Sequence, residues 1–379
     1  MNIDKVTTSL RHGYEKLSIQ NAIQKNAALQ SVIVSLNKNR NEIFEANKID
    51  VDKARSNGMS EPLIDRLSLD NKKLDSIIEG INAIIQQTDP IGQELTGWKT
   101  PNGLQIKQIR VPIGVVAIIY ENRPNVTVDA FCLAYKSGNS ILLRSSSSAL
   151  HSNKAIVKAI KEGLSATEGG FGIPEAIELA PCESHDEVEQ ILTAVGKIDL
   201  ALPRGGQNLI KMVVEKAKVP VIETGSGICH LYVDSEADLD MAVNIAENGK
   251  IQRPGVCNAL ECIVVNKSIA SDFLNSLICR FDGKVKLHCD DFSYNLIQSL
   301  ACSQQYKDLI FPATEEDFLT EFLDYECAIK SVDNVSEAIS FINSHNTKHS
   351  ESIITNNLST AKLFQQCIDA SCVYVNAST

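Results

Sequence analysis

Short apolar runs alternate with helix-like segments between residues 115 and 223, and this alternation constrains the fold more than any other feature of the chain. The runs that read as strands are residues 115–120, 141–143, 176–180, 200–202 and 221–223. Continuous apolar strands separated by helices predict a parallel sheet that helices cover on both faces. Such a sheet binds ligands beyond the carboxyl ends of its strands, so we expect functional residues in the turns that follow them.

The regions on either side of this set predict a chain of two domains. Residues 1 to about 88 read as helical, because an apolar stripe at helical spacing runs through 74–85. Residues 98–112 read as a polar hairpin. A second set of alternating strands and helices follows residue 225. The pattern therefore predicts an α/β fold with domains 1–223 and 224–379.

Composition excludes several classes of protein. The 379 residues carry a formal net charge of -11, which argues against nucleic acid or an anionic membrane as a partner. No apolar run is long enough to cross a bilayer, and the polar N-terminus has no segment like a signal peptide. The 11 cysteines are scattered without the spacing of a zinc site. We therefore expect a cytoplasmic protein with reduced thiols and no metal.

Cys257 is the candidate nucleophile, because it follows a turn built on Pro254 and Gly255 that lifts a thiol out of the core. A thiolate attacks an activated acyl carbon or an aldehyde well. A buried structural cysteine is the competing interpretation, and Cys257 alone leaves the two almost even.

Four arginines fall in turns that we place at the ends of apolar strands: Arg123, Arg144, Arg204 and Arg253. In an acidic protein, guanidinium groups at strand ends suggest phosphate or carboxylate ligands. Surface salt bridges would account less easily for all four.

The strand-end turns hold further candidates. Gly205 and Gly206 would let a phosphate approach the backbone at a helix N-terminus, although paired glycines are common in plain turns. Arg144 and the serines after it could hold a ribose 2′-phosphate or form a solvated helix cap. Asn122 could donate to an oxyanion or serve only as a turn residue. Glu223 could be a general base or a structural contact.

Five segments carry a resemblance to a known family. They are VPIGVVAIIYENRPNVTVDA (111–130), LPRGG (202–206), VPVIETGSGICHLYVD (219–234), QRPGVCNALE (252–261) and VYVNAST (373–379). Taken in order, they resemble the aldehyde dehydrogenase superfamily, and within it the branch that reduces an acyl phosphate. The resemblance implies two doubly wound α/β domains, the first binding cofactor and the second catalytic, with 94–112 as an oligomerisation hairpin. The family continues past the position of Thr379 into a C-terminal tail that is absent here, so we expect weakened activity and a disturbed oligomer.

The resemblance also assigns roles to residues. Cys257 becomes the nucleophile, Asn122 the oxyanion donor and Glu223 the general base. Arg123, Arg253 and Asn258 become substrate-binding residues, and no metal is needed. The implied cofactor-binding residues are Arg144, Ser145, Pro181, Arg204, Gly205, Gly206 and Gly225.

The implied reaction is the NADPH-dependent reduction of L-γ-glutamyl 5-phosphate to L-glutamate 5-semialdehyde and phosphate, through a thioacyl enzyme, in proline biosynthesis. The implied partners are a small-molecule substrate and further copies of the chain, as a dimer or tetramer. A thioester-hydrolysing aldehyde dehydrogenase and a truncated, non-catalytic homologue are the alternatives. The sequence leaves open the preference for NADPH over NADH and which arginine meets which anion of the substrate.

Overall fold

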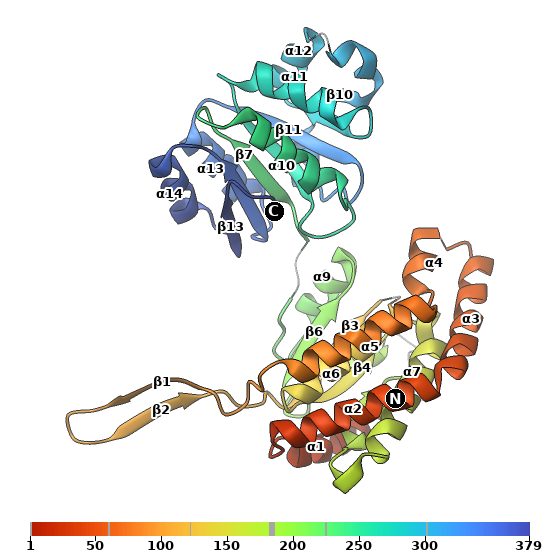
Figure 1. Cartoon of the computed structure of the whole chain (residues 1–379). Coiled ribbons are helices and arrows are strands. Elements are labelled where there is room, and N and C mark those ends of the chain that lie inside the picture. The colour runs from red at the N-terminus through yellow and green to blue at the C-terminus, as the bar shows by residue number, and fades with distance from the viewer. Residues whose placement is uncertain (1, 60, 122, 182–185, 224–225, 301) are drawn as a thin grey trace. The chain divides into compact units, whose positions relative to one another are not determined.

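The computed structural model describes residues 2–59, 61–121, 123–181, 186–223, 226–300 and 302–379. The chain divides into two compact units, unit 1 (Met1–Thr224) and unit 2 (Gly225–Thr379). Each unit is built around a parallel sheet with helices on both faces (Figure 1). The predicted α/β class is thereby confirmed.

Unit 1 begins with helices and continues into its sheet. Its helices are α1 (Ile3–Leu17), α2 (Ala22–Lys38), α3 (Arg40–Ser56), α4 (Glu61–Leu67), α5 (Asn71–Gln86), α6 (Pro124–Lys136), α7 (Leu150–Ser165), α8 (Asp186–Leu192) and α9 (Gln207–Lys216). Its strands are β1 (Glu94–Lys99), β2 (Gln105–Ile109), β3 (Val115–Tyr120), β4 (Ser140–Arg144), β5 (Ile177–Leu179) and β6 (Leu200–Arg204).

The sheet of unit 1 has the strand order β5-β4-β3-β6, and every pairing in it is parallel. Ile141 and Leu143 pack on one face with α2, α5, α6 and α7, whereas Leu142 faces the opposite core with α8 and α9. Successive residues of a strand point to opposite faces, so a continuous apolar run fills both cores.

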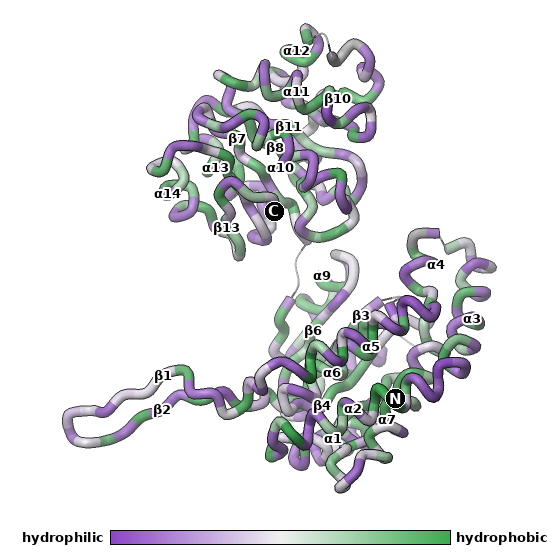
Figure 2. The backbone as a smooth tube through the Cα atoms, viewed as in Figure 1, coloured by the Kyte–Doolittle hydropathy of each residue, from purple (hydrophilic) through white to green (hydrophobic). Residues whose placement is uncertain are grey.

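Strands β1 and β2 pair antiparallel into a hairpin that projects from the rest of unit 1 (Figure 1). Every residue of β1 is exposed, including Leu95 and Trp98. Figure 2 shows hydrophobic residues along this ribbon, where no described core covers them. The turn contains Gly103 at φ +91°, in the left-handed region that favours glycine. The hairpin thus exposes apolar side chains and unpaired strand edges.

Unit 2 repeats the alternation. Its helices are α10 (Leu239–Ile251), α11 (Ala270–Phe281), α12 (Asp291–Gln298), α13 (Val335–His345) and α14 (Leu358–Cys367). Its strands are β7 (Cys229–Val233), β8 (Leu260–Asn266), β9 (Lys286–Cys289), β10 (Ile310–Pro312), β11 (Glu326–Val332), β12 (Ser350–Ile354) and β13 (Cys372–Val375).

The sheet of unit 2 has the order β10-β9-β11-β8-β7-β12-β13, again with parallel pairings throughout. Helices α10, α11 and α12 cover one face, and α13 and α14 cover the other. All seven residues of β8 are buried (Figure 2 labels this strand). Because all these pairings are parallel, the amino ends of the strands lie along one edge of the sheet.

The predicted strand at 221–223 is wrong. Val221 makes a single parallel bridge to Ala201, and regular pairing goes no further. Pro220 has no N–H to donate, and the chain leaves the sheet after Ile222 donates to the Ala201 carbonyl. No helix among the described residues has both the length and the apolar character that a membrane span requires.

Candidate functional site

Cys257 lies on a loop between α10 and β8, and its side chain is exposed. The loop contains Pro254 and Gly255, and a backbone bond from Ala259 N–H to the Val256 carbonyl, 3.0 Å long, closes a turn around the cysteine. Because β8 begins at Leu260, the loop sits at the amino end of that strand. The thiol is therefore presented from the amino edge of the sheet.

The neighbouring strand β7 holds this loop from the side. A Cβ added to Gly227 would overlap the carbonyl oxygen of Cys257, so only glycine fits there. Cys229 Sγ lies 3.4 Å from the same carbonyl oxygen. The Gly227 N–H donates to Glu321 Oε1 at 2.7 Å, which fixes the glycine in turn. The backbone of Cys257 is therefore closely packed while its thiol faces outward.

An ion pair joins the two ends of the loop. Lys250, in the last turn of α10, places Nζ 2.7 Å from Glu261 Oε2, near the start of β8. Both side chains are buried. Burial raises the pKa of Glu261 to about 7, and the charge and hydrogen bond of Lys250 act in the opposite direction. A buried ion pair thus spans the base of the loop.

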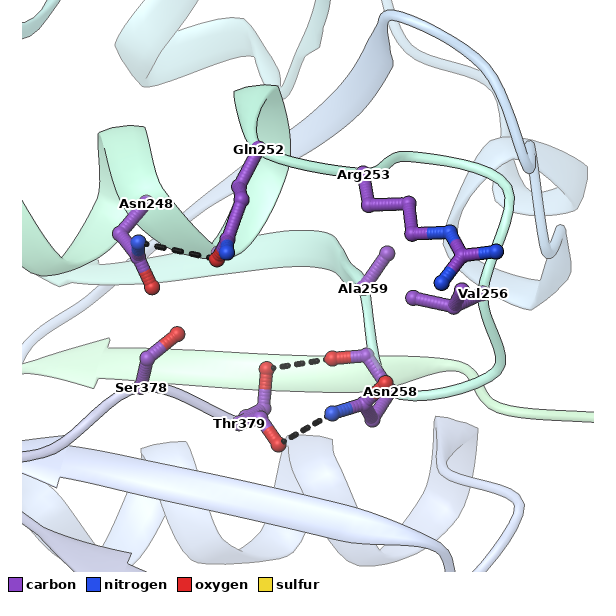
Figure 3. Close-up of a pocket in the computed structure, with 9 residues that line it drawn as sticks. Asn248, Gln252, Arg253, Val256, Asn258, Ala259, Ser378 and Thr379 are labelled. Atoms are coloured by element: carbon purple, nitrogen blue, oxygen red, sulfur yellow. Dashed lines mark hydrogen bonds between the residues drawn. The ribbon is translucent and has the colours of Figure 1, made fainter. Parts of the chain in front are cut away.

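A pocket of about 260 Å³ opens on the same loop (Figure 3). Arg253 and Asn258, which flank Cys257, both line it. Arg253 is exposed and makes no ion pair within the described part of the chain. The other lining residues are Asn248, Gly249, Gln252, Val256, Ala259, Ser378 and Thr379. An unpaired guanidinium among amides and hydroxyls suits a ligand that carries carboxylate or phosphate oxygens.

The segment after β13 closes one side of this pocket. Asn258 Nδ2 donates to the Thr379 carbonyl at 3.0 Å, and Thr379 Oγ1 donates to the Asn258 carbonyl at 2.9 Å (Figure 3). Asn376 has φ +53°, and this left-handed residue lies where the chain leaves β13 toward the loop. Two distant motifs of the sequence, 252–261 and 373–379, are thus in direct contact.

The other cysteines are less suited to reaction. Burial raises the pKa of the thiols of Cys132, Cys229, Cys262, Cys289 and Cys327, which keeps them protonated at neutral pH. The remaining exposed free thiols among the described residues, Cys367 at the end of α14 and Cys372 at the start of β13, lie outside the loop. Cys257 itself is not among the residues that line the pocket, but its neighbours Val256 and Asn258 are. The expectation that all cysteines are reduced is wrong at Cys279, which is disulfide-bonded. Pairing of this kind cannot be deduced from spacing.

The carboxyl edge of the unit 1 sheet gathers a second group of predicted residues. Arg144 and Arg204 are the last residues of β4 and β6, which flank β3, and their registry partners are Ile119 and Tyr120. Pro181 follows β5 at the same edge. Ser145 is buried directly after Arg144. Parallel pairing therefore brings these residues together as expected.

The turn after β6 already holds an anionic oxygen. The Gly206 N–H donates to Glu121 Oε2 at 3.1 Å, and a Cβ on Gly205 would lie 2.6 Å from that oxygen. Gly206 is the N-cap of α9, where helix N–H groups favour negative charge. The turn thus fits a phosphate oxygen of a nucleotide cofactor, provided that the Glu121 carboxylate moves aside.

Several predicted site residues are placed differently or not at all. Asn122 and Gly225 lie outside the described residues. Arg123 is the N-cap of α6, just beyond β3, whereas Glu223 is exposed on the segment that leaves unit 1. The strand-end placement of Arg253 is wrong, because it follows α10 and precedes β8. The extension of α10 to Ile251 carries the arginine to the amino edge instead.

Sequence reasoning missed the supports of the loop. Glu261 stands inside an otherwise apolar strand, and a carboxylate in a buried strand requires a partner, so this signal was present. The roles of Gly227 and Glu121 depend on long-range contacts that no local pattern reveals. In the described part of the chain, no group of His, Cys, Asp and Glu side chains could hold a metal ion.

Comparison with known proteins places these residues in a wider context. The model of the aldehyde dehydrogenase family matches residues 2–290. Gamma-glutamyl phosphate reductase of Alkaliphilus metalliredigens is 46% identical over 370 residues, which cover 98% of this chain and 86% of that protein. The crystal structure of gamma-glutamyl phosphate reductase from Thermotoga maritima is 43% identical with a TM-score of 0.94, covering 100% of this chain and 88% of that one. An engineered glycolyl-CoA reductase with bound NADP+ shares the fold at 15% identity and a TM-score of 0.66, covering 99% of this chain and 87% of that one.

Proposed function

This chain belongs to the aldehyde dehydrogenase family, and from that premise we propose that it reduces L-γ-glutamyl 5-phosphate to L-glutamate 5-semialdehyde with release of phosphate. The observation that carries the proposal is the exposed Cys257 thiol on a loop whose flanking residues line an anion-suited pocket. The names of the relatives supply the substrate and a place in proline biosynthesis. A small, anionic substrate and a nicotinamide cofactor suit an enzyme of the cytoplasm.

Residues of unit 2, together with Asn122 and Glu223 of unit 1, carry the first half of the reaction. Cys257 attacks the acyl carbon as a thiolate, the bond from that carbon to the phosphate oxygen breaks, and inorganic phosphate leaves a thioester on the sulfur. Arg253 and Asn258 hold the anionic substrate at the pocket, which keeps the acyl carbon in line with the sulfur. Asn122 and Glu223 take the roles that family membership suggests, oxyanion donor and general base.

The residues of unit 1 hold the cofactor. Arg204, Gly205 and Gly206 bind phosphate oxygens at the N-terminus of α9. Pro181 and Gly225 are assigned to the cofactor only by resemblance to the family. Arg144 meets the adenosine ribose, and its guanidinium gives a preference for the 2′-phosphate of NADPH over NADH. The predicted contact of Ser145 with the cofactor does not fit its fully buried side chain, so we leave Ser145 out of this proposal. When bound, the nicotinamide supplies the hydride that reduces the thioester to the aldehyde.

A phosphate-dependent assay in the reverse direction tests the proposal. The chain is mixed with glutamate 5-semialdehyde and NADP+, and NADPH formation is followed with and without inorganic phosphate. We expect turnover only with phosphate, because phosphate must release the acyl group from Cys257. Turnover without phosphate would identify a thioester-hydrolysing enzyme instead, and no turnover in either case would reject the assignment.

We also propose that the hairpin Glu94–Ile109 joins copies of the chain into a homo-oligomer. An isolated two-stranded hairpin is marginal in water, and this one exposes Leu95 and Trp98 by about half. A second chain could cover those side chains and pair with a free edge. Sedimentation of the chain and of Leu95→Glu/Trp98→Glu tests this, since the substitutions should convert an oligomer into monomers without changing the helix content.

A further inference from the structure

The loop that presents Cys257 is closed at its base by the Lys250–Glu261 ion pair, which the catalytic scheme above does not use. The Nζ to Oε2 distance is 2.7 Å, and the side chains are 0% and 1% exposed. Lys250 lies one residue before the end of α10, and Glu261 is the second residue of β8. The eleven-residue separation between them thus encloses the whole segment from Gln252 to Leu260.

Stability does not explain this pair. Removing two charges from water costs free energy that their mutual attraction often fails to recover, and apolar residues of similar volume usually serve as well. In the described part of unit 2, each other ion pair of a lysine or arginine has one side chain at least 30% exposed. The lone fully buried pair of this kind is therefore found at the base of the loop that carries the thiol.

The pair is also connected to the contact that fixes Cys257 from the side. Glu261 Oε1 accepts the Leu323 N–H at 3.3 Å, and two residues earlier Glu321 accepts the Gly227 N–H at 2.7 Å. The segment 321–323 therefore braces both the base of the loop and the glycine that touches the Cys257 carbonyl. Movement at the base would alter the direction in which the sulfur points.

We propose that the Lys250–Glu261 ion pair positions the Cys257 thiol, by fixing the distance between the two ends of its loop. The proposal rests on Cys257 being the nucleophile. Lys250 and Glu261 do not touch the substrate, so they are positioning residues and act through the loop. Small displacements of a reacting atom reduce rates strongly, because near-attack geometry is lost before affinity is.

The variant Lys250→Met/Glu261→Leu tests this, since it removes both charges and keeps apolar volume. We expect its Tm to be no lower than that of the parent. We expect kcat to fall about 10- to 100-fold with little change in KM. The rate at which iodoacetamide alkylates Cys257 should change by a similar factor at fixed pH. Mass spectrometry of the peptide that contains Cys257 measures this rate.

Unit 1 offers a matched control. Lys25 and Asp89 form a comparable pair, 2.5 Å apart with side chains 1% and 13% exposed, in the other unit. Lys25→Met/Asp89→Leu should leave the alkylation rate and kcat within about twofold. The charge swap Lys250→Glu/Glu261→Lys should recover most of the parent alkylation rate, because it restores an ion pair across the same ends.

Three outcomes separate the positioning role from its alternatives. Alkylation and kcat within twofold of the parent in the Met/Leu variant would overturn the positioning role. Loss of the folded state in that variant would also count against it, if Lys250→Met alone folds and alkylates normally. Failure of the proposed function is separate, because it would abolish phosphate-dependent turnover in the parent, whereas the alkylation rates still report whether the pair orients the sulfur.

Discussion

The two units present their candidate residues from opposite edges of similar parallel sheets. In unit 1, Arg144 and Arg204 end neighbouring strands, so ordinary topology brings them to the carboxyl edge. In unit 2, Cys257 precedes β8 and lies at the amino edge. Specific contacts place it there: the Gly227 backbone, the Lys250–Glu261 pair and the segment 321–323. Topology alone places the candidate binding groups of unit 1, whereas the placement of the candidate nucleophile of unit 2 depends on individual contacts.

The first test of this contrast is the thiol itself. Cys257→Ser should lower phosphate-dependent turnover at least about 10³-fold, because the hydroxyl is a far poorer nucleophile. Steady-state assay of NADPH formation measures it. Cys367→Ser, at an exposed cysteine on α14, is the matched control and should retain full turnover. Unchanged activity in Cys257→Ser would show that Cys257 is not the nucleophile.

The Gly227 contact should matter almost as much. Gly227→Ala places a Cβ on the Cys257 carbonyl, so the loop must shift, and we expect kcat to fall about 100-fold. Thermal unfolding of the same variant reports the accompanying loss of stability. Gly80→Ala, in α5 with open space around it, should instead stabilise by roughly 0.5–1 kcal/mol. Normal kcat in Gly227→Ala would mean that the loop tolerates displacement.

The buried pair should make stability depend on pH. Burial raises the pKa of Glu261 from 4.5 to about 7, with Lys250 opposing the rise and Glu321 adding to it. The folded chain therefore binds this proton more tightly than the unfolded chain, and the stabilisation is lost as pH rises through 7. The variant Lys250→Met/Glu261→Leu has no carboxyl group at position 261, so its stability does not fall in this way as pH rises. Its free energy of unfolding relative to the parent should rise by on the order of 3 kcal/mol between about pH 5 and 8.

Urea titrations followed by circular dichroism at several pH values would measure that difference. A constant difference across the range would show that Glu261 does not titrate near neutrality in the folded chain.

The smallest effects should come from the carboxyl edge of unit 1. Arg144→Ala should raise the KM for NADPH about tenfold and leave the KM for NADH nearly unchanged, because only NADPH carries the 2′-phosphate. Arg204→Ala should raise both. In each case kcat should change little. Arg280→Ala, which breaks an exposed pair with Glu247, serves as the control. A large fall in kcat in Arg144→Ala would mean that the carboxyl edge of unit 1 affects the chemical step and not only cofactor binding.

The features that could be predicted from the sequence are those that follow from the pattern of apolar residues. The apolar runs identified β3, β4 and β6, and strand-end reasoning placed Arg144 and Arg204 correctly, because parallel strands share one carboxyl edge. The same reasoning failed for Arg253, since α10 continues to Ile251 and the following turn belongs to the amino edge. The Gly227 contact joins residues 30 positions apart along the chain, counted from Gly227 to Cys257. No periodicity reports such a contact.

The hairpin of β1 and β2 has a consequence for handling the protein. Its ribbon has free edges and half-exposed Leu95 and Trp98, and it gains most from burial against another molecule. Association of folded chains draws the folding equilibrium forward by mass action. The association that we propose for the hairpin therefore predicts that the thermal midpoint and the specific activity of this protein rise with its concentration, so both should be measured over a series of dilutions.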